Sequence, residues 1–364
     1  MKEQMADYSG ILRAKELLVK ARANSFMSVH PFYFGKTVLI TGAGGSIGSA
    51  LAKQIAAAMP KRLILLDHNE NGVYDLLQDL YMEYGHVEWI CPEILSVCNA
   101  VGLVSVFLKY QPQIVFHAAA HKHVPLMEAA CCEAVQNNVI GTLNTLTAAQ
   151  KTCVERFVLI STDKAVEPYG VMGATKRVCE LLLLASASQS PNGAIYCAVR
   201  FGNVTQSAGS VLPLFELQIK SGKPLTLTDR RATRYFMNTA QAVQLLVSAG
   251  AMAKGGEIFS LDMGEPLRIY DLAMALLLES GLPVTEAEKH IVETGLRPGE
   301  KLEEVSLRTS DALPTAQQEI FYISPTPPDL PTLRSGIQCL QASLQRWDAA
   351  AVRSELFSIL SQVQ

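Results

Sequence analysis

The sequence TVLITGAGGSIG occupies residues 37–48, and a second apolar run, LILLD, follows at residues 63–67 after about one helix of chain. Gly42, Gly45 and Gly48 have the G-x-x-G-x-x-G spacing of a turn from a strand into a helix. Gly42 allows the tight turn, Gly45 allows backbone to approach a diphosphate, and Gly48 allows the helix to pack on the sheet. The N–H groups at the helix start favour phosphate. Asp67, at the end of the second run, can accept hydrogen bonds from an adenosine ribose. The stretch therefore predicts a dinucleotide-binding βαβ unit.

Strand and helix patterns alternate from residue 37 to about residue 200. Nearly continuous apolar strands separated by helices indicate an α/β fold with a parallel sheet covered on both faces. We expect a Rossmann-type doubly wound sheet in the order 3-2-1-4-5-6, with ligands at the carboxyl ends of the strands. The strands are expected at 37–41, 62–66, 87–91, 113–117, 156–161 and 194–200, and the helices at 46–59, 70–84, 99–109, 133–151 and 170–188.

The rest of the chain predicts three further parts. Residues 1–34 form a helical appendage, with helical spacing over Ile11–Ala23 that suits packing on the core or on another subunit. The NAD-binding domain covers 35–200. Frequent proline, glycine and threonine after residue 200 indicate a smaller, mixed α/β substrate lobe over 201–330, with contributions from both parts of the chain and with helices at 239–250 and 269–280. Residues 331–364 are expected to be helical, with one helix over 340–363 that packs on the core or forms an oligomer.

The composition argues against several classes of protein. The 364 residues carry a net charge of −3 with no basic block, so neither nucleic acid nor an anionic membrane is an expected partner. The eight cysteines lack metal-site spacing and are expected to be reduced. His121 and His123 are two residues apart on a loop, and no metal is expected there. Without a signal peptide or an apolar run of about 18–20 residues, the chain is expected to be soluble and cytoplasmic.

Polar residues follow the strand predicted at 156–161. The sequence STDKAV occupies 161–166, and MGATK opens the next helix at 172–176. Short-chain dehydrogenases carry Tyr-x-x-x-Lys at this place, one helical turn apart, so that both side chains face the nicotinamide. Here Lys176 is present and Met172 replaces the tyrosine, whereas Tyr169 is almost two turns away. The residues alone leave open whether the chain is an enzyme or only binds the cofactor.

Several long motifs resemble one family closely. The chain resembles the retaining UDP-N-acetylglucosamine 4,6-dehydratases, which are CapD-like polysaccharide-biosynthesis enzymes of the extended short-chain dehydrogenase group. The resemblance covers about residues 36–305, and Met172 in place of tyrosine is itself typical of the retaining branch. Many members carry N-terminal membrane spans, and this chain resembles the short, soluble form. The matching motifs are TGAGGSIG (41–48), KHVPLME (122–128), STDKAV (161–166), MGATK (172–176), RFGNV (200–204), TRYFM (233–237), LDMGEP (261–266) and LRPGEKL (296–302).

The resemblance implies an internal redox cycle on the sugar. NAD oxidises C-4, the C-5 proton and the C-6 hydroxyl leave, and hydride returns to C-6, so the cofactor stays tightly bound. Lys164 matches the base at C-5, which requires burial and the nearby Lys176 to lower its pKa. Asp163 matches the acid at the C-6 hydroxyl, which requires its pKa to be raised in the closed site. Thr162 can bond the C-4 oxygen, and in the absence of the tyrosine either Thr162 or a water must relay its proton. Lys176 is expected to hold the nicotinamide ribose beside Met172.

The same resemblance implies the residues that bind the two ligands. The absence of an arginine after Asp67 favours NAD over NADP. Arg234 and Arg297 suit the substrate diphosphate. The expected cofactor-binding residues are Gly42, Gly44, Gly45, Ser46, Ile47, Gly48, Asp67, Asn69, Glu93, Ile94, Ala118, Ala119, Ala120, Lys122, Asn138 and Lys176. The expected substrate-binding residues are His123, Val124, Asn203, Val211, Arg234, Arg297 and Glu300.

The sequence departs from the family motifs at two places, and several alternative functions stay open. Pro92-Glu93 stands where the family has Gly-Asp near the adenine, and Thr205-Gln206 replaces Leu-Gly beside the sugar nucleotide. UDP-N-acetylglucosamine is the expected substrate, but a GDP-sugar fits a similar cleft. The alternatives are a 4-epimerase, a C-5-inverting dehydratase and a non-catalytic NAD-binding protein. A homo-oligomer is expected.

Overall fold

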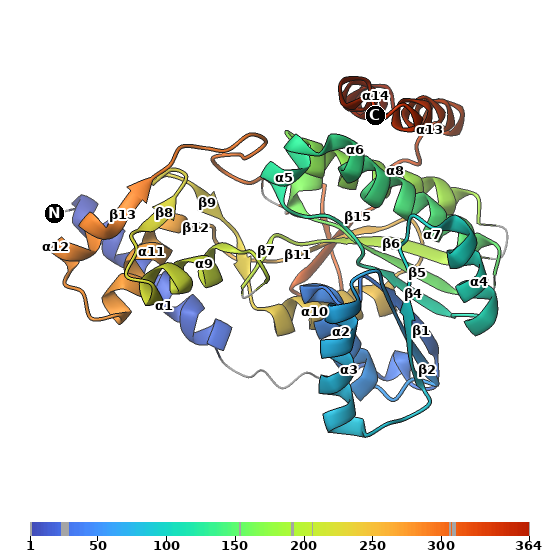
Figure 1. Cartoon of the computed structure of the whole chain (residues 1–364), viewed down its shortest axis with the longest axis horizontal. Coiled ribbons are helices and arrows are strands. Elements are labelled where there is room, and N and C mark those ends of the chain that lie inside the picture. Colours follow the sequence, from blue (N-terminus) through green and yellow to red (C-terminus); the bar gives the residue numbers. More distant parts are fainter. Residues whose placement is uncertain are drawn as a thin grey trace.

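A computed structural model of the chain describes residues 2–22, 29–152, 154–190, 193–205, 207–305, 307 and 311–363. Within these residues the centre of the molecule is a nine-stranded sheet in the order β14-β15-β11-β6-β5-β4-β1-β2-β3 (Figure 1). Its strands are β1 (Thr37–Thr41), β2 (Arg62–Asp67), β3 (Ile90–Ile94), β4 (Ile114–His117), β5 (Arg156–Ile160), β6 (Ile195–Arg200), β11 (Ile258–Leu261), β14 (Leu313–Pro314) and β15 (Ile320–Ile323).

The sheet confirms the predicted Rossmann-type order and extends it. Strands β3-β2-β1-β4-β5-β6 are parallel neighbours, as the sequence predicts. The chain then returns after residue 200 to add β11 parallel to β6, and β15 antiparallel to β11. Strand β3 begins three residues later than predicted, because a turn in which the Ile90 N–H bonds to the Val87 carbonyl precedes it.

Helices cover both faces of the sheet (Figure 1). Alternate residues of β1 point to opposite faces: Val38 and Ile40 pack beneath α2, α3 and α10, whereas Leu39 packs beneath α4, α7 and α8. Strand β1 is therefore buried along its whole length. The covering helices are α2 (Ser46–Ala57), α3 (Glu70–Tyr84), α4 (Ala100–Tyr110), α5 (Val124–Ala129), α6 (Cys131–Ala134), the π-helix η2 (Val135–Ile140), α7 (Gly141–Gln150), α8 (Val171–Ser188) and α10 (Thr239–Met252).

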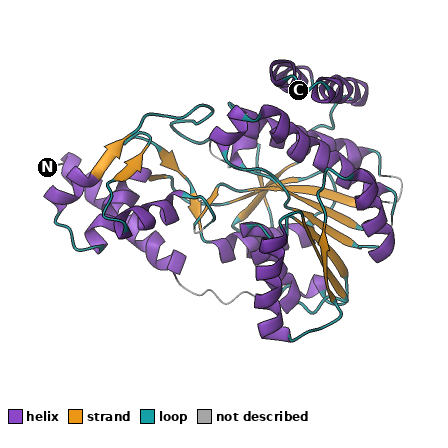
Figure 2. Ribbon diagram, in the orientation of Figure 1, coloured by secondary structure: helices purple, strands orange, loops and turns teal. Residues whose placement is uncertain are grey.

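A smaller lobe combines helices with short paired strands (Figure 2). Helix α1 (Lys2–Arg22) belongs to this lobe, where Ala14 and Leu18 are buried against α11. The sequence left its packing partner open, and Ala23 lies outside the described residues. The other elements at or near this lobe are β7 (Asn203–Val204), α9 (Val211–Lys220), β8 (Leu225–Leu227), β9 (Thr233–Arg234), β10 (Phe236–Met237), β12 (Leu267–Arg268), α11 (Ile269–Glu279), α12 (Val284–Ala287), η4 (Glu288–His290) and β13 (Ile291–Glu293).

The C-terminal region is a helical hairpin, so the prediction of one helix over 340–363 was wrong. Helix α13 (Leu330–Gln345) ends just before Trp347, whose φ of 53° lies in the left-handed region. Asp348 then caps α14 (Ala349–Gln362) by accepting a hydrogen bond from the N–H of Ala351. The hairpin packs its apolar side on α8 and α6.

Two short segments complete the description. The 3-10 helix η1 (Pro31–Tyr33) joins α1 to β1, and the Tyr33 hydroxyl donates to the Val247 carbonyl of α10 at 2.7 Å. The 3-10 helix η3 (Asp163–Ala165) follows β5.

Seven cysteines in the described ranges have free thiols. No helix in the part of the chain that the structure describes has both the length and the apolar character needed to span a membrane.

A fully buried ion pair joins α8 to the carboxyl ends of two central strands. Arg200, which ends β6, donates from Nε and Nη2 to the two carboxylate oxygens of Glu180, both at 2.7 Å. Ser161 after β5 and Arg177 on α8 donate to the same carboxylate at 2.7 and 3.0 Å. Burial disfavours this charge, but Arg200, Arg177 and Ser161 outweigh it and lower the pKa of Glu180 to about 2.

Replacing Glu180 should destabilise the fold strongly. The substitution Glu180→Gln leaves the Arg200 guanidinium buried without its counter-charge, which costs about 3–5 kcal/mol in free energy of unfolding. Urea denaturation of both proteins measures this difference. Because the folded pKa lies below the unfolded value of about 4.3, the difference should be constant above about pH 5 and shrink as the pH falls toward 2.

The exposed ion pair between Lys53 and Asp79, at 2.7 Å, provides the control. Asp79→Asn should change stability by less than about 1 kcal/mol, because solvent screens an exposed pair. Equal losses in Glu180→Gln and Asp79→Asn would contradict a special role for the buried pair.

Candidate active site

A cavity of about 620 Å³ lies at the carboxyl ends of β1, β4 and β5, where the sequence predicts the dinucleotide. Gly42 has a φ of +69°, and a Cβ on it would lie 2.6 Å from the N atom of Ala119. A Cβ on Gly48 would lie 1.9 Å from the Gly42 carbonyl oxygen. The glycine loop therefore fits against the β4 loop and against its own helix only without side chains.

This cradle fits the predicted NAD. Helix α2 begins after Gly45 without a side-chain cap, so the first N–H groups of the helix are free to bind a diphosphate. Asp67 braces the loop: its two carboxylate oxygens accept hydrogen bonds from the N–H groups of Gly44 and Asn69, at 3.0 and 2.9 Å. Lys176 and Met172, one turn apart on α8, line the same cavity.

Most of the expected cofactor residues come together at this cavity. The residues that line it are Gly42, Gly44, Gly45, Ser46, Ile47 and Gly48 of the glycine loop, and Asn69, Ala118, Ala120, Lys122 and Lys176. Glu93 does not, because its side chain turns to α4 and bonds to Lys109 and the Tyr110 hydroxyl, both at 2.7 Å. Ile94 is half exposed at the end of β3. Ala119 lies behind the glycine loop as described above.

Asn138 acts beneath the cavity wall instead of lining it. It lies in the π-helix η2 and is almost fully buried. Its side-chain Oδ1 accepts from the His121 N–H at 2.7 Å, and its side-chain Nδ2 donates to the Thr175 hydroxyl on α8 at 3.0 Å. Asn138 therefore fixes the loop that presents Lys122, relative to α8.

A buried histidine supports the same wall. His117, at the end of β4, bonds to Thr41 at 2.7 Å through Nδ1 and to Thr142 at 2.9 Å through Nε2. Burial and the neighbouring Lys176 lower the pKa of His117 to about 3, so this histidine stays neutral and structural near neutral pH. Burial also lowers the pKa of Lys176.

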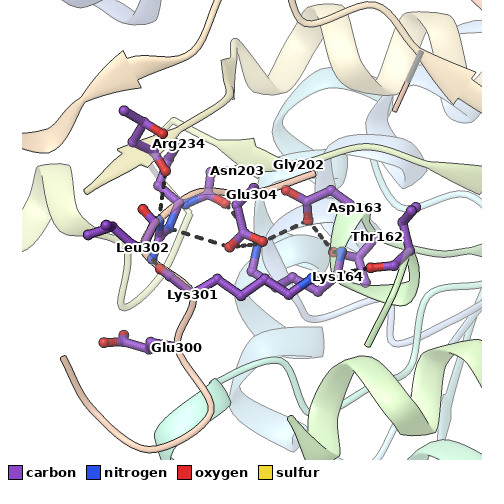
Figure 3. A network of polar contacts seen from close by, with 12 residues as sticks. Thr162, Asp163, Lys164, Gly202, Asn203, Arg234, Glu300, Lys301, Leu302 and Glu304 are labelled. Atoms are coloured by element: carbon purple, nitrogen blue, oxygen red, sulfur yellow. Dashed lines mark hydrogen bonds and ion pairs between the residues drawn. The ribbon is translucent and has the colours of Figure 1, made fainter. Parts of the chain in front are cut away.

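Thr162, Asp163 and Lys164 form a connected polar group after β5 (Figure 3). The Thr162 hydroxyl donates to Asp163 Oδ1 at 2.8 Å, and Lys164 Nζ donates to the same oxygen at 3.0 Å. Thr162 and Lys164 line the large cavity. Asp163 is almost fully buried, and its Oδ2 lies against the backbone of Gly202, with no hydrogen-bond partner among the described residues. Asp163 thus reaches the cavity only through its two neighbours.

The environment of Lys164 differs from the expectation. Its Nζ contacts Asp163, Asn203 Oδ1 at 3.2 Å and Glu304 Oε1 at 3.2 Å (Figure 3). Burial disfavours the ammonium, but the carboxylates of Asp163 and Glu304 outweigh it and raise the pKa of Lys164. The expected lowering by burial and Lys176 was wrong, because two carboxylates lie within contact distance.

The expected diphosphate ligands lie in an adjoining cavity of about 160 Å³. Arg297 is largely exposed and binds Glu300 Oε1 at 2.6 Å through Nη2. Arg234 is more enclosed: its Nη atoms donate to the carbonyls of Thr233, Leu302 and Lys301, and its Nε lies 3.5 Å from Glu304. Arg297 is therefore the more accessible of the two arginines.

The remaining residues expected to bind the substrate lie around the two cavities, except Val211. His123 lies on both cavities, and its ring approaches Gly209 so closely that a Cβ there would be 2.5 Å from it. Val124 and Glu300 line the smaller cavity, and Asn203 lies between the two. Val211 packs with the apolar cluster of the small lobe. Thr205 is buried beside this region, and Gln206 lies outside the described residues.

Three acidic residues with structural roles here were not anticipated. Glu180 follows Lys176 by one helical turn inside an apolar run, a signal for a buried ion pair that could have been used. Glu128 accepts from the N–H of Val171 at the start of α8 and from Arg353 of α14, the latter at 2.7 Å. Glu304 has no distinguishing local pattern.

In the described ranges, no three His, Cys, Asp or Glu side chains are grouped to hold a metal ion.

Comparison with known proteins agrees with this geometry. A family model described as polysaccharide biosynthesis protein matches residues 38–325. The capsular polysaccharide biosynthesis protein CapD of Staphylococcus aureus is 47% identical over 287 residues, which are 79% of this chain and 47% of that protein. The probable polysaccharide biosynthesis protein EpsC of Bacillus subtilis is 49% identical over 277 residues, 76% of this chain and 46% of that protein. The chain thus spans about half the length of these two curated relatives.

Among solved structures, Pen from Bacillus thuringiensis superposes with a TM-score of 0.72 and 34% identity, covering 81% of this chain and 90% of that one. The family match extends from β1 through β15 and includes the glycine loop, the Thr162–Lys164 group and both arginines. The chain therefore belongs to the polysaccharide biosynthesis protein family, as its CapD-like motifs predict.

Proposed function

We propose that the protein catalyses the NAD-dependent 4,6-dehydration of UDP-N-acetylglucosamine, with retention of configuration at C-5. The product is UDP-2-acetamido-2,6-dideoxy-α-D-xylo-hexos-4-ulose, an intermediate suited to glycan or deoxyamino-sugar biosynthesis. The observation that carries the proposal is the hydrogen-bonded group of Thr162, Asp163 and Lys164 on the cavity that Met172 and Lys176 also line. It supplies both an acid and a base, as this elimination requires.

NAD, when bound, supplies the acceptor and later the donor of the hydride exchanged with the sugar. The glycine loop would hold its diphosphate, and Lys176 its nicotinamide ribose. Asp67 favours NAD over NADP, because its carboxylate would repel a 2′-phosphate and no arginine follows to neutralise it.

Thr162 and Asp163 provide a path for the proton of the C-4 hydroxyl. As C-4 is oxidised, Thr162 accepts this proton and passes its own to Asp163 Oδ1, 2.8 Å away. In the elimination, Asp163 returns a proton through Thr162 to the C-6 hydroxyl, which leaves as water. The buried Asp163 therefore acts through Thr162, and Met172 needs to contribute no proton.

Lys164 serves as the base at C-5. In its neutral form it removes the C-5 proton during elimination and returns a proton to the same carbon as C-6 is reduced. Because one group acts from one face, the C-5 configuration is retained. Met172, which lines the same cavity, carries no proton that could invert it.

A 4-epimerase remains the second candidate. Epimerisation needs only oxidation and reduction at C-4, so it has no use for a base beside C-5. The juxtaposition of Lys164 and Asp163 therefore favours dehydration, and it also argues against a protein that only binds NAD.

The product of UDP-N-acetylglucosamine turnover in D₂O tests the reaction by NMR. We expect a 4-keto-6-deoxy product with deuterium at C-5 and retained configuration. Lys164→Met should lower turnover by at least about 10²-fold, because no base remains, while NAD and substrate binding persist. Lys53→Met, on the exposed side of α2, is the control and should have the normal rate.

Each other outcome points elsewhere. A galacto epimer would support the 4-epimerase, an inverted C-5 would show protonation from the other face, and no change in the sugar would favour a binding protein. Near-normal turnover by Lys164→Met would remove Lys164 from the role of base.

The purified protein should carry bound NAD without any being added. The cofactor is regenerated in each cycle, and Ala208, whose N–H donates to the Ser46 hydroxyl at 3.1 Å, lines the same cavity as the glycine loop. Denaturing the protein and assaying the supernatant enzymatically should give close to one NAD per chain. Stoichiometric NADP, or consumption of added NAD during turnover, would contradict this prediction.

Arg297→Ala should mainly weaken substrate binding. The guanidinium can exchange Glu300 for the substrate diphosphate, and loss of such charge-assisted bonds costs about 1.5–3 kcal/mol, so KM should rise about tenfold or more with little change in kcat. Arg230→Ala is the matched control, since Arg230 binds Glu293 on the surface of the same lobe at 2.8 Å. A fall in kcat with KM unaltered would place Arg297 outside the diphosphate site.

A further inference from the structure

Glu304 reaches the reacting groups from a different part of the chain. It follows the LRPGEKL motif on the small-lobe side, and its side chain is only 3% exposed. We propose that Glu304 is a positioning residue that holds the Lys164 side chain in place and sets its protonation state. The consequence for catalysis rests on the proposed function, whereas the effect of Glu304 on Lys164 does not.

The contact geometry defines the position of Lys164 Nζ. Asp163 Oδ1 lies 3.0 Å from it, Glu304 Oε1 3.2 Å and Asn203 Oδ1 3.2 Å (Figure 3). These three acceptors come from η3 after β5, from the loop after residue 300 and from β7. An ammonium has three protons to donate, so this arrangement suits the charged form of Lys164.

Arg234 anchors Glu304 from the small lobe. Its guanidinium donates to the main-chain carbonyls of Lys301 and Leu302, at 2.8 and 3.0 Å, and its Nε faces Glu304 at 3.5 Å. Arg234 lies in β9, which pairs with β12 and is therefore fixed in the lobe. The small lobe thus delivers a carboxylate to a lysine of the Rossmann domain.

The charges around Lys164 make Glu304 decisive once the reaction begins. Asp163 loses its negative charge when it takes up the C-4 proton, which leaves Glu304 as the remaining anion in contact with Lys164 among the described residues. Arg234 opposes the ammonium, and Lys176 lines the cavity from α8. The other charged residues on the adjoining cavity are Lys122, Arg297, Glu300 and Lys301.

Competitive acylation of lysines with acetic anhydride, read out peptide by peptide by mass spectrometry, tests this directly in the full-length protein. The reagent modifies only neutral amines, and Lys164 is 21% exposed, so its rate reports its protonation. Glu304→Gln removes one contacting charge, which should lower the pKa of Lys164 by about 1–3 pH units and raise its acylation rate at pH 8 at least about tenfold. Glu303→Gln removes the neighbouring exposed charge and should leave the rate unchanged.

Glu304→Asp keeps the charge on a shorter side chain and should give an intermediate rate, which also provides a test if Glu304→Gln does not fold. In the wild type, kcat/KM should fall on the acidic side of its pH profile with the pKa of Lys164. In Glu304→Gln this acidic limb should move to lower pH by the same amount as the pH dependence of the acylation rate. An unchanged acylation rate in Glu304→Gln, or an equal rise in Glu303→Gln, would overturn the assignment of Glu304. Absence of sugar turnover in the wild type, with the acylation shift present, would instead refute the proposed function and leave the role of Glu304 intact.

Discussion

The buried pair between Glu180 and Arg200 is the constraint on which the site depends. The proposed reacting groups lie on three elements: the segments after β5 and β6, and the first turns of α8. Glu180 lies on α8, one helical turn after Lys176. It accepts a hydrogen bond from Ser161, which directly precedes Thr162. It also binds Arg200, which precedes the segment that carries Asn203. One carboxylate therefore sets the relative position of all three. Because Glu180, Ser161 and Arg200 are all buried, solvent does not replace a lost bond between them.

A second charge cluster, made of Asp163, Lys164, Arg234 and Glu304, differs from the Glu180 cluster in how completely its oxygens are paired. Glu180 has every oxygen paired, whereas Asp163 and Glu304 each keep one buried oxygen without a partner among the described residues. A fully satisfied network stabilises a fold, but an incompletely satisfied one keeps capacity for a proton or for a substrate hydroxyl. The contrast suits a structural role for the Glu180 cluster and the proposed catalytic role for the second cluster, to which the small lobe contributes Arg234.

The sequence predicted the framework well, because local patterns determine it. The period-two and period-3.6 patterns and the glycine loop led to the sheet order and to the helices that cover it, and adjacency in the sequence brought Thr162, Asp163 and Lys164 together. Contacts between distant segments were not predictable in this way. No local feature distinguishes Glu304 from Glu303, and nothing near Glu93 indicates that it turns toward Lys109. The same limitation contributed to the wrong pKa direction for Lys164, since that direction depends on Glu304, 140 residues away, as well as on the adjacent Asp163.

The C-terminal hairpin has a consequence for molecular symmetry. Helices α13 and α14 cover the side of α8 that faces away from the sheet, and Arg353 of α14 is linked through Glu128 to the first N–H of α8. A two-fold dimer whose axis passes beside α8 would require that surface to be vacant on both copies. Self-association of this chain must therefore use another face, or it must first release the hairpin and with it the link to the helix that carries Lys176.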